Sequence, residues 1–347
     1  MFVGKIDAFM EEYLKTHKFM GAVRVTVRDD IIYERFFGYA DVDRKIPIRR
    51  DTLFSFYSMT KPFTAIGLML LCDKGLVSLD AHPSLYVPEC SAIDKRLTVR
   101  MLLNHTSGLP DFELTPEFCE RYAPGTPEKV REHIRLISEY PMLFEPGTNA
   151  KYENINFILA ALIIENVSGI GYADYMKERV LKPLGAKTAY VDSYSPFVCG
   201  GAVGYEESNG GLSPINRGTD WMLGAGDIVG TLDDAYVLNT AYKEKLLLSE
   251  EAWREILSPS PINNMGLGNT VNVWHGKKRI AHNGGHLGFR TLHTYLPEYD
   301  FDIIILSNCG FGNARIEIGN GIHNAYFGDD SEVTNEYKMD AGYIKNL

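Results

Sequence analysis

Hydrophobic and polar positions follow two different periods near the start of the chain. Residues 3–17 carry apolar or aromatic side chains every three or four positions, which is the spacing of an amphipathic helix. Residues 22–27 and 31–37 are instead rich in β-branched and aromatic side chains, and the charged residues 28–30 separate them. This pattern predicts a helix followed by a β-hairpin.

The helical period dominates from about residue 58 to residue 219. Apolar stretches with this period are separated by loops that contain Pro and Gly, such as H-T-S-G-L-P and F-E-P-G-T. Helices are predicted near residues 60–74, 97–104, 127–139, 156–167 and 172–181. The middle of the chain is therefore expected to be a mostly helical lobe.

The strand-like pattern returns in the last part of the chain. After Asp233 we expect one or two further helices, then four strands joined by turns, and a closing helix. The strands are predicted at residues 271–274, 279–282, 289–296 and 301–307, and the helix at residues 315–327.

Strands at both ends of the sequence, with helices between them, predict an α+β fold with a discontinuous layout. One antiparallel sheet is expected to be built from both chain ends and flanked by helices, with the helical lobe inserted between its strands. The predicted lobes are an α/β lobe of residues 1–57 and 220–347 and a mostly helical lobe of residues 58–219.

Composition places the chain among folded globular proteins. Of its 347 residues, 45% are hydrophobic and 23% are charged, which argues against a disordered, collagen-like or coiled-coil chain. The formal net charge is -10, and the sequence contains no run of Lys or Arg. We therefore expect neither nucleic acid nor an anionic membrane surface as a partner.

The apolar runs of the sequence are short. The longest, residues 63–72 and 157–164, are well below the roughly 20 residues that a membrane-spanning helix requires. The first residues include acidic side chains where a signal peptide would have a basic stretch and then an apolar run. The expectation from these two features is a cytoplasmic protein.

The cysteines are odd in number, widely scattered and without a C-x-x-C pair. They are Cys72, Cys90, Cys119, Cys199 and Cys309. This usage predicts reduced thiols rather than a disulfide framework, and it argues against a zinc cluster.

Ser58-Met59-Thr60-Lys61 is the only S-x-x-K in the sequence. It follows a strand-like stretch and opens an apolar helix, with Pro62 in the first turn, where a missing N–H costs nothing. Ser58 would stand at the helix N-terminus with Lys61 one turn later on the same face. The ammonium group and the helix dipole favour negative charge on the serine oxygen, and a desolvated amine can accept its proton. Ser58 is thus a candidate nucleophile; the alternative is a Ser cap followed by a solvated Lys.

Tyr152-Glu153-Asn154 is the only Y-x-N, and it lies in a loop just before an apolar helix. A Tyr phenol near an ammonium group can exchange protons with a nucleophile, because the positive charge draws its pKa down. Asn154 can donate a hydrogen bond to a substrate carbonyl. The alternatives are a half-buried aromatic ring for Tyr152 and a helix cap for Asn154.

The third candidate is the H-N-G-G segment of residues 282–285, at the end of a strand-like stretch. Two glycines weaken a strand unless something approaches its backbone closely, as at a substrate-binding edge. A backbone N–H of this segment, together with that of Ser58, would form an oxyanion hole. His282 and His286 are four positions apart, but the glycines between them argue against the helix that a shared metal site would need.

Four segments in this order resemble one superfamily. S-M-T-K, L-L-N-H-T-S-G-L-P, F-E-P-G-T…K-Y-E-N and H-N-G-G-H-L-G-F are similar to motifs of the serine β-lactamases and penicillin-binding proteins. More narrowly, they resemble the branch of class C β-lactamases, esterases and D-amino-peptidases. The resemblance extends from about Gly21 to Asn308, and it implies a β-lactamase/transpeptidase-like fold with the active site between the two lobes.

The resemblance also implies roles for individual residues. Ser58 matches the nucleophile, Lys61 its partner base, Tyr152 the second proton carrier and Asn154 the residue that binds the substrate amide; His282, Asn283 and Gly284 match the third motif, and Gly285 the residue whose N–H completes the oxyanion hole. These roles need neither a metal nor another cofactor.

The sequence departs from the family in the third motif, where β-lactamases usually carry K-T-G and this chain has H-N-G. A histidine of ordinary pKa is only partly protonated at pH 7, so the anchor for a β-lactam carboxylate is weakened unless Arg290 replaces it. Class A is not indicated, because its S-D-N motif is missing. His105, within N-H-T-S-G, is predicted to organise its loop rather than to act as a base.

The expected function is a serine hydrolase that acts through an acyl-enzyme on small esters or amides, of the esterase or D-amino-peptidase type. At most weak β-lactamase activity is expected. The first alternative is a penicillin-binding or sensor protein that is acylated without efficient turnover, and a metallohydrolase that uses the histidines is a distant third. The sequence leaves the natural substrate and the oligomeric state open.

Overall fold

A six-stranded antiparallel sheet forms the centre of the computed structural model, which describes residues 2–111, 127–192, 201–208, 211–215, 222–274 and 276–328. Its strands lie in the order β10-β11-β12-β13-β1-β2. Their bounds are Thr270–Trp274 for β10, Lys277–His286 for β11, Phe289–Leu296 for β12, Phe301–Ser307 for β13, Gly21–Val27 for β1 and Asp30–Phe37 for β2.

Strands from the two ends of the chain lie side by side in this sheet. β1 pairs with β13 so that Gly21 lies opposite Ser307 and Val27 opposite Phe301. The predicted sheet of both chain ends is therefore confirmed. One strand is longer than predicted: β11 continues to His286, and its two glycines pair with residues of β12 instead of ending the strand.

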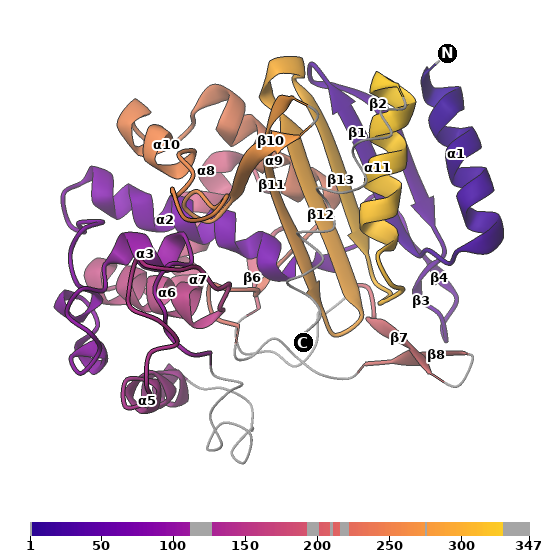
Figure 1. Cartoon of the computed structure of the whole chain (residues 1–347). Helices are drawn as coiled ribbons and strands as arrows, with labels where there is room; N and C mark the ends of the chain where they lie inside the picture. Colours follow the sequence, from indigo (N-terminus) through magenta and orange to yellow (C-terminus); the bar gives the residue numbers. More distant parts are fainter. Residues whose placement is uncertain are drawn as a thin grey trace.

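Helices cover both faces of the sheet. The first helix, α1 (Phe2–Thr16), and the last described helix, α11 (Ala314–Phe327), pack together on one face, as Figure 1 shows. Apolar side chains such as Ile6 on α1 and Val25 on β1 share one buried cluster there. The amphipathic pattern of α1 thus corresponds to one buried and one solvated side, whereas α11 is at least partly buried around most of its surface.

The opposite face packs against the helical part of the chain, on the other side of the sheet in Figure 1. Its helices are α2 (Thr60–Asp73), α3 (Val99–Leu103), α5 (Pro127–Ile137), α6 (Ile155–Ser168), α7 (Tyr172–Met176), a π-helical turn (Lys177–Leu181) and α8 (Lys182–Leu184), followed by α9 (Leu232–Glu244) and α10 (Glu250–Ile256). The helix predicted at residues 172–181 is thus divided into short segments.

Helices α2 and α6 form the centre of this part. Ten of the fourteen residues of α6 are buried, and it has no polar face. Each buried Ile or Leu side chain contributes about 1.5–3 kcal/mol to folding, so this helix is stabilised by burial on all sides. The two central helices also carry the motif residues: Lys61 lies in α2, and Asn154 directly precedes α6.

Short elements complete the fold. The small sheets are β3 (Tyr39–Asp41) with β4 (Ile46–Pro47), then β5 (Phe54–Ser55) with β9 (Ile228–Gly230) and β6 (Tyr190–Val191), and β7 (Tyr205–Ser208) with β8 (Gly211–Pro214). The 3₁₀ turns are Tyr57–Met59, Pro83–Leu85, Pro88–Cys90 and Pro297–Tyr299. The predicted lobe boundaries near residues 57 and 219 remain a prediction.

Within the described residues, no single helix has the length and apolar character needed to cross a membrane. Only α6 together with the α7–α8 segment meets these criteria, and the two are bent by 83° relative to each other. Cys72, Cys90 and Cys309 are free thiols. Cys119 and Cys199 lie outside the described residues.

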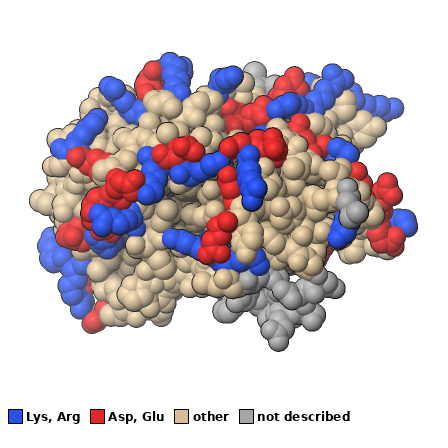
Figure 2. All heavy atoms as spheres, turned by 90° about the horizontal axis from the view of Figure 1, so that it is seen from above, with Lys and Arg blue, Asp and Glu red and all other residues tan. Residues whose placement is uncertain are grey.

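Acidic and basic side chains intermingle on the face of the molecule that Figure 2 shows, without a large area of one sign. Many of the described charges form ion pairs at the surface, for example Lys182 with Glu178 at 2.6 Å. Exposed pairs of this kind contribute only about 0–1 kcal/mol each to stability.

Candidate active site

A sharp turn places Ser58 between the sheet and the helices. Strand β5 and the N–H of Phe56, which donates to the carbonyl of Ile228 at 2.8 Å, hold the chain just before it. Tyr57 then adopts a φ of 47°, a left-handed conformation that is unfavourable for a bulky residue. Ring contacts of Tyr57 with His286 and Phe289 accompany this conformation. The turn leaves Ser58 half-buried at the entry to α2.

Lys61 forms three hydrogen bonds within the site. Its Nζ donates to Ser58 Oγ at 3.0 Å, to Asn154 Oδ1 at 2.9 Å and to the carbonyl of Ala225 at 2.8 Å. Its side chain is fully buried, and burial lowers the pKa of Lys61 to about 7, although the charge of Asp111 opposes this shift. Near neutral pH the amine and ammonium forms are therefore both populated, as a proton acceptor for Ser58 requires.

Tyr152 lies over Lys61, with the Nζ of Lys61 4.7 Å from the centre of the tyrosine ring. The ring of His105 stacks on Tyr152 with the ring centres 4.3 Å apart. His105 also accepts the backbone N–H of Glu153 at its Nδ1, 3.3 Å away, and burial lowers the pKa of His105 well below its usual value. His105 is thus a neutral support for the Tyr152 loop, in line with the prediction that it organises this region.

Asn154 connects the loop to two other segments. Its Oδ1 accepts the bond from Lys61, and its backbone N–H donates to Asp111 Oδ2 at 2.8 Å. Asn154 is also the N-cap residue of α6, directly before its first residue, Ile155. The structure therefore brings Ser58, Lys61, Tyr152 and Asn154 together, although they are separated by up to about a hundred residues in the sequence.

The 282–285 segment of β11 lies beside this group. Strand β10 covers β11 only as far as Ala281, so the next residues have no strand on that edge and approach the Tyr57–Met59 turn instead. A Cβ atom on Gly284 would lie 2.2 Å from the carbonyl oxygen of Phe56. A glycine is therefore required at this position because the backbone of Phe56 approaches it closely. The sequence alone suggested only that a substrate would approach this strand.

Replacing Gly284 by alanine is expected to push β11 away from the Ser58 turn. No flexible side chain can yield, because the clash is with a backbone carbonyl and with the buried Thr291 hydroxyl, also 2.2 Å away. We expect at least a tenfold loss of hydrolytic activity and a lower melting temperature, measured by ester hydrolysis and thermal unfolding. Gly4→Ala is the control, since a Cβ there meets no atom within 4 Å. An unchanged Gly284→Ala protein would contradict this account.

His282 is buried and electrically neutral. Its Nδ1 lies 2.7 Å from the carbonyl oxygen of Asn283, which fixes the ring hydrogen on Nδ1 and leaves Nε2 as an acceptor. Burial and the nearby charge of Lys61 lower the pKa of His282 to about 3. The sequence led us to expect a partly protonated histidine here, and the structure corrects this expectation. No positive charge is present on His282 at neutral pH.

Arg290 does not place a charge on the face of the sheet that carries His282. It pairs with Gly285 across the sheet, so its side chain is on the face opposite to that of His282. Its Nη1 donates to the carbonyl of Phe289, and its Nη2 lies near Gly310. The guanidinium group lies over Gly285, with Nη1 3.6 Å from the position that a Cβ atom would take there.

Asp111, Asp227 and Ala225 also belong to the site, although the sequence did not single them out. The carbonyl of Ala225 accepts a bond from Lys61, and both carboxylates act on its charge. Asp111 directly follows the H-T-S-G-L-P motif, so its position could have been noticed. A backbone carbonyl such as that of Ala225 leaves no trace in a sequence.

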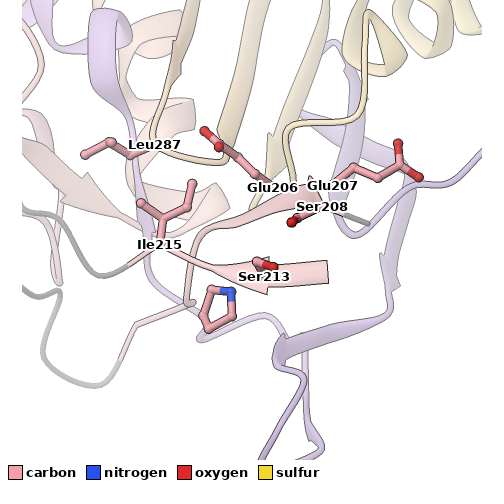
Figure 3. Close-up of a pocket in the computed structure, with 7 residues that line it drawn as sticks. Glu206, Glu207, Ser208, Ser213, Ile215 and Leu287 are labelled. Atoms are coloured by element: carbon pink, nitrogen blue, oxygen red, sulfur yellow. The ribbon is translucent and has the colours of Figure 1, made fainter. Parts of the chain in front are cut away.

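A separate hollow of about 680 Å³ lies beside the β7–β8 hairpin (Figure 3). It is lined by Glu206, Glu207, Ser208, Ser213, Pro214, Ile215 and Leu287. Leu287 belongs to the turn that follows β11, but none of the predicted catalytic residues lines this hollow. One of its carboxylates, that of Glu207, is already paired with Lys18 at 2.7 Å.

Comparison with known proteins identifies relatives of several kinds. Penicillin-binding protein 4* of Bacillus subtilis is 27% identical over 327 residues, which cover 87% of this chain and 71% of that protein. Esterase EstB of Burkholderia gladioli is 29% identical over 205 residues, 55% of this chain and 52% of the esterase. The D-aminopeptidase of Gluconobacter oxydans is 26% identical over 300 residues, 83% of this chain and 55% of that enzyme.

A solved structure and a family model agree on the fold. The octameric penicillin-binding protein homologue from Pyrococcus abyssi superposes with a TM-score of 0.81 at 24% identity, over 98% of this chain and 81% of that one. The predicted β-lactamase/transpeptidase-like fold is thereby confirmed. The family model for beta-lactamase matches residues 6–321. The chain is a hydrolase that belongs to the β-lactamase family.

Proposed function

We propose that the protein is a serine hydrolase that acts through an acyl-enzyme on small esters or amides. The observation that carries this proposal is the 3.0 Å bond between Lys61 Nζ and Ser58 Oγ, made by a fully buried amine. In this proposal the site lies between an α/β lobe of residues 1–57 and 220–347 and a helical lobe of residues 58–219.

The reaction has two halves. Ser58 Oγ forms a bond to the substrate carbonyl carbon while its proton passes to Lys61 or Tyr152, and the backbone N–H groups of Ser58 and Gly285 bind the resulting oxyanion. Lys61 or Tyr152 then returns the proton to the leaving alcohol or amine. Water then cleaves the acyl-serine ester, which releases the acid and restores the hydroxyl. Asn154 binds the substrate amide where there is one.

The state of His282 supports esters and amides over β-lactams. Penicillins and cephalosporins carry a carboxylate, and a cation beside the nucleophile is needed to balance it. With its pKa near 3, His282 offers only a hydrogen-bond acceptor. Relatives named esterase and D-aminopeptidase are in line with this substrate class.

We expect kcat/KM for p-nitrophenyl butyrate to exceed that for a chromogenic cephalosporin. His282→Lys supplies the missing cation, so it should shift the ratio of the two values towards the cephalosporin by about tenfold, the effect of roughly 1.4 kcal/mol. The control is His17→Lys, because His17 is exposed at the end of α1. A wild-type enzyme that prefers the cephalosporin tenfold would contradict the substrate assignment and leave the acyl-enzyme proposal intact.

A penicillin-binding protein without efficient turnover is the second candidate, favoured by relatives that carry that name. A time course separates the two functions. Continued release of p-nitrophenol over many turnovers supports the hydrolase, whereas a burst of one equivalent per protein followed by a halt supports the acylated binding protein.

A further inference from the structure

A buried carboxyl group lies between the two loop residues of the proposed site. Glu153 separates Tyr152 from Asn154 in the sequence, and only 5% of its surface is exposed. A second buried carboxyl group, that of Asp111, forms a hydrogen bond with it. Neither residue has a role in the acyl-enzyme steps described above.

Two carboxylates in a buried site cannot both be ionised without a large cost, and a hydrogen bond between them requires a proton. Burial, and then the charge of Asp111, raise the pKa of Glu153 to about 8. Lys151, whose Nζ lies 2.5 Å from Glu153 Oε1, opposes this shift only in part. At neutral pH the pair therefore holds one proton and one negative charge.

This pair is tied to the loop on both sides of Glu153. Asp111 Oδ2 accepts the backbone N–H of Asn154 at 2.8 Å. The backbone N–H of Glu153 itself donates to His105, whose ring stacks on Tyr152. The position of Tyr152 and of Asn154 relative to Lys61 thus depends on the segment that the carboxyl pair fixes.

We propose that Asp111 and Glu153 are positioning residues that share one proton, and that loss of this proton at alkaline pH switches the site off. The second negative charge forces the two carboxylates apart and displaces the Tyr152–Asn154 loop. The second negative charge also stabilises the ammonium form of Lys61, in the same way as the charge of Asp111 already does. Lys61 then keeps its proton and cannot accept one from Ser58. The inference rests on the proposed function, because it assigns these effects to Lys61, Tyr152 and Asn154.

The charges around the pair come from several segments. Among the described residues these are Lys151 beside Glu153 and Lys61 beyond Asp111, with Asp227 acting on Lys61 from the other side. His105 contributes no charge, because burial keeps it neutral. Among these described groups, Lys61 loses its proton near pH 7 and the carboxyl pair loses its proton near pH 8.

The test is the pH dependence of kcat/KM for p-nitrophenyl butyrate between pH 5.5 and 10. Wild-type activity should rise through about pH 7, where Lys61 loses its proton, and fall again near pH 8. Glu153→Gln keeps a hydrogen-bond donor to Asp111 but cannot ionise, and Asp111→Asn leaves one carboxyl group in the pair. Both variants should lose the alkaline fall. In Glu153→Gln the rise near pH 7 should move by less than half a unit, because Asp111 is unchanged. In Asp111→Asn the rise should move to lower pH, because the charge of Asp111 no longer raises the pKa of Lys61.

Thermal unfolding gives a second result that does not depend on catalysis. The folded protein keeps Glu153 protonated above its ordinary pKa of 4.5, so the wild type loses stability relative to Glu153→Gln as the pH rises from about 4.5 to about 8. The difference in melting temperature should therefore grow from pH 5 to pH 8.5 in favour of the variant. A constant difference would overturn the shared proton.

Glu145→Gln is the matched control, because Glu145 is exposed and paired with Arg96 at the surface. It should keep both limbs of the profile. An alkaline fall that persists in both pair variants would overturn the proposal. If the wild-type activity were instead independent of Ser58, the proposed function would fail, and the unfolding experiment would still decide whether the carboxyl pair shares a proton.

Discussion

Replacing Ser58 by alanine is expected to lower kcat/KM for ester hydrolysis by a factor on the order of 10⁴–10⁶, the loss typical of a removed nucleophile. The reason is the arrangement around Lys61: of its three acceptors, only the Ser58 hydroxyl can form a covalent bond to a substrate. A fluorophosphonate probe should also label the wild type on the peptide that contains Ser58, as mass spectrometry can detect. The variant should remain unlabelled.

The control for this experiment is Ser55→Ala, which changes a buried serine in the same junction of strand and helix. It should keep the label and most of the activity. A chelator such as EDTA should leave the wild-type rate unchanged, because the proposed steps use no metal ion. An adduct on a different serine, or loss of turnover with EDTA, would contradict the mechanism.

Tyr152→Phe is expected to reduce kcat/KM by about 10²–10⁴-fold, the usual contribution of a group that transfers a proton. The substitution removes only the phenolic oxygen. The remaining ring can still stack on His105 and lie over Lys61, so a loss of activity reports on proton transfer rather than on packing. Lys61→Ala should cost at least as much, because it removes the other proton carrier.

Tyr236→Phe is the matched control, since its hydroxyl donates to Asp29 at the surface, away from the site. It should behave like the wild type in both activity and thermal unfolding. A Tyr152→Phe enzyme within about threefold of the wild type would assign Tyr152 to structure alone.

The main elements were predictable because their patterns are long. Strand β13 is buried along its whole length, and α6 is apolar without interruption from Phe157 to Ile164, so both stand out in the sequence. Strands β5 and β6 have only two residues each, which is too short for any periodicity. Such strands exist because larger neighbours bring them together, and their sequences carry no signal of their own.

The proposed site was predictable where a local rule applies. Ser58 and Lys61 are three positions apart at a helix start, which places them on one face in any helix. The neutral state of His282 could not be predicted, because it depends on burial and on a lysine more than two hundred residues away. The contact of Asp111 with Asn154 likewise arises only when two loops meet.

The pairing of β1 with β13 has a consequence for biosynthesis. Strand β1 leaves the ribosome early. Its partner strand is β13, in which Ser307 lies opposite Gly21, and β13 is made only near the end of the described chain. The chain is synthesised at about 5–20 residues per second, so tens of seconds pass between the synthesis of the β1–β2 hairpin and that of β13. During this time one edge of β1 has no partner strand. Sheet formation is therefore a late, non-local event, and it is slow because the closing contact spans almost the whole sequence. During this interval the unpaired edge of β1 is open to pairing with other chains.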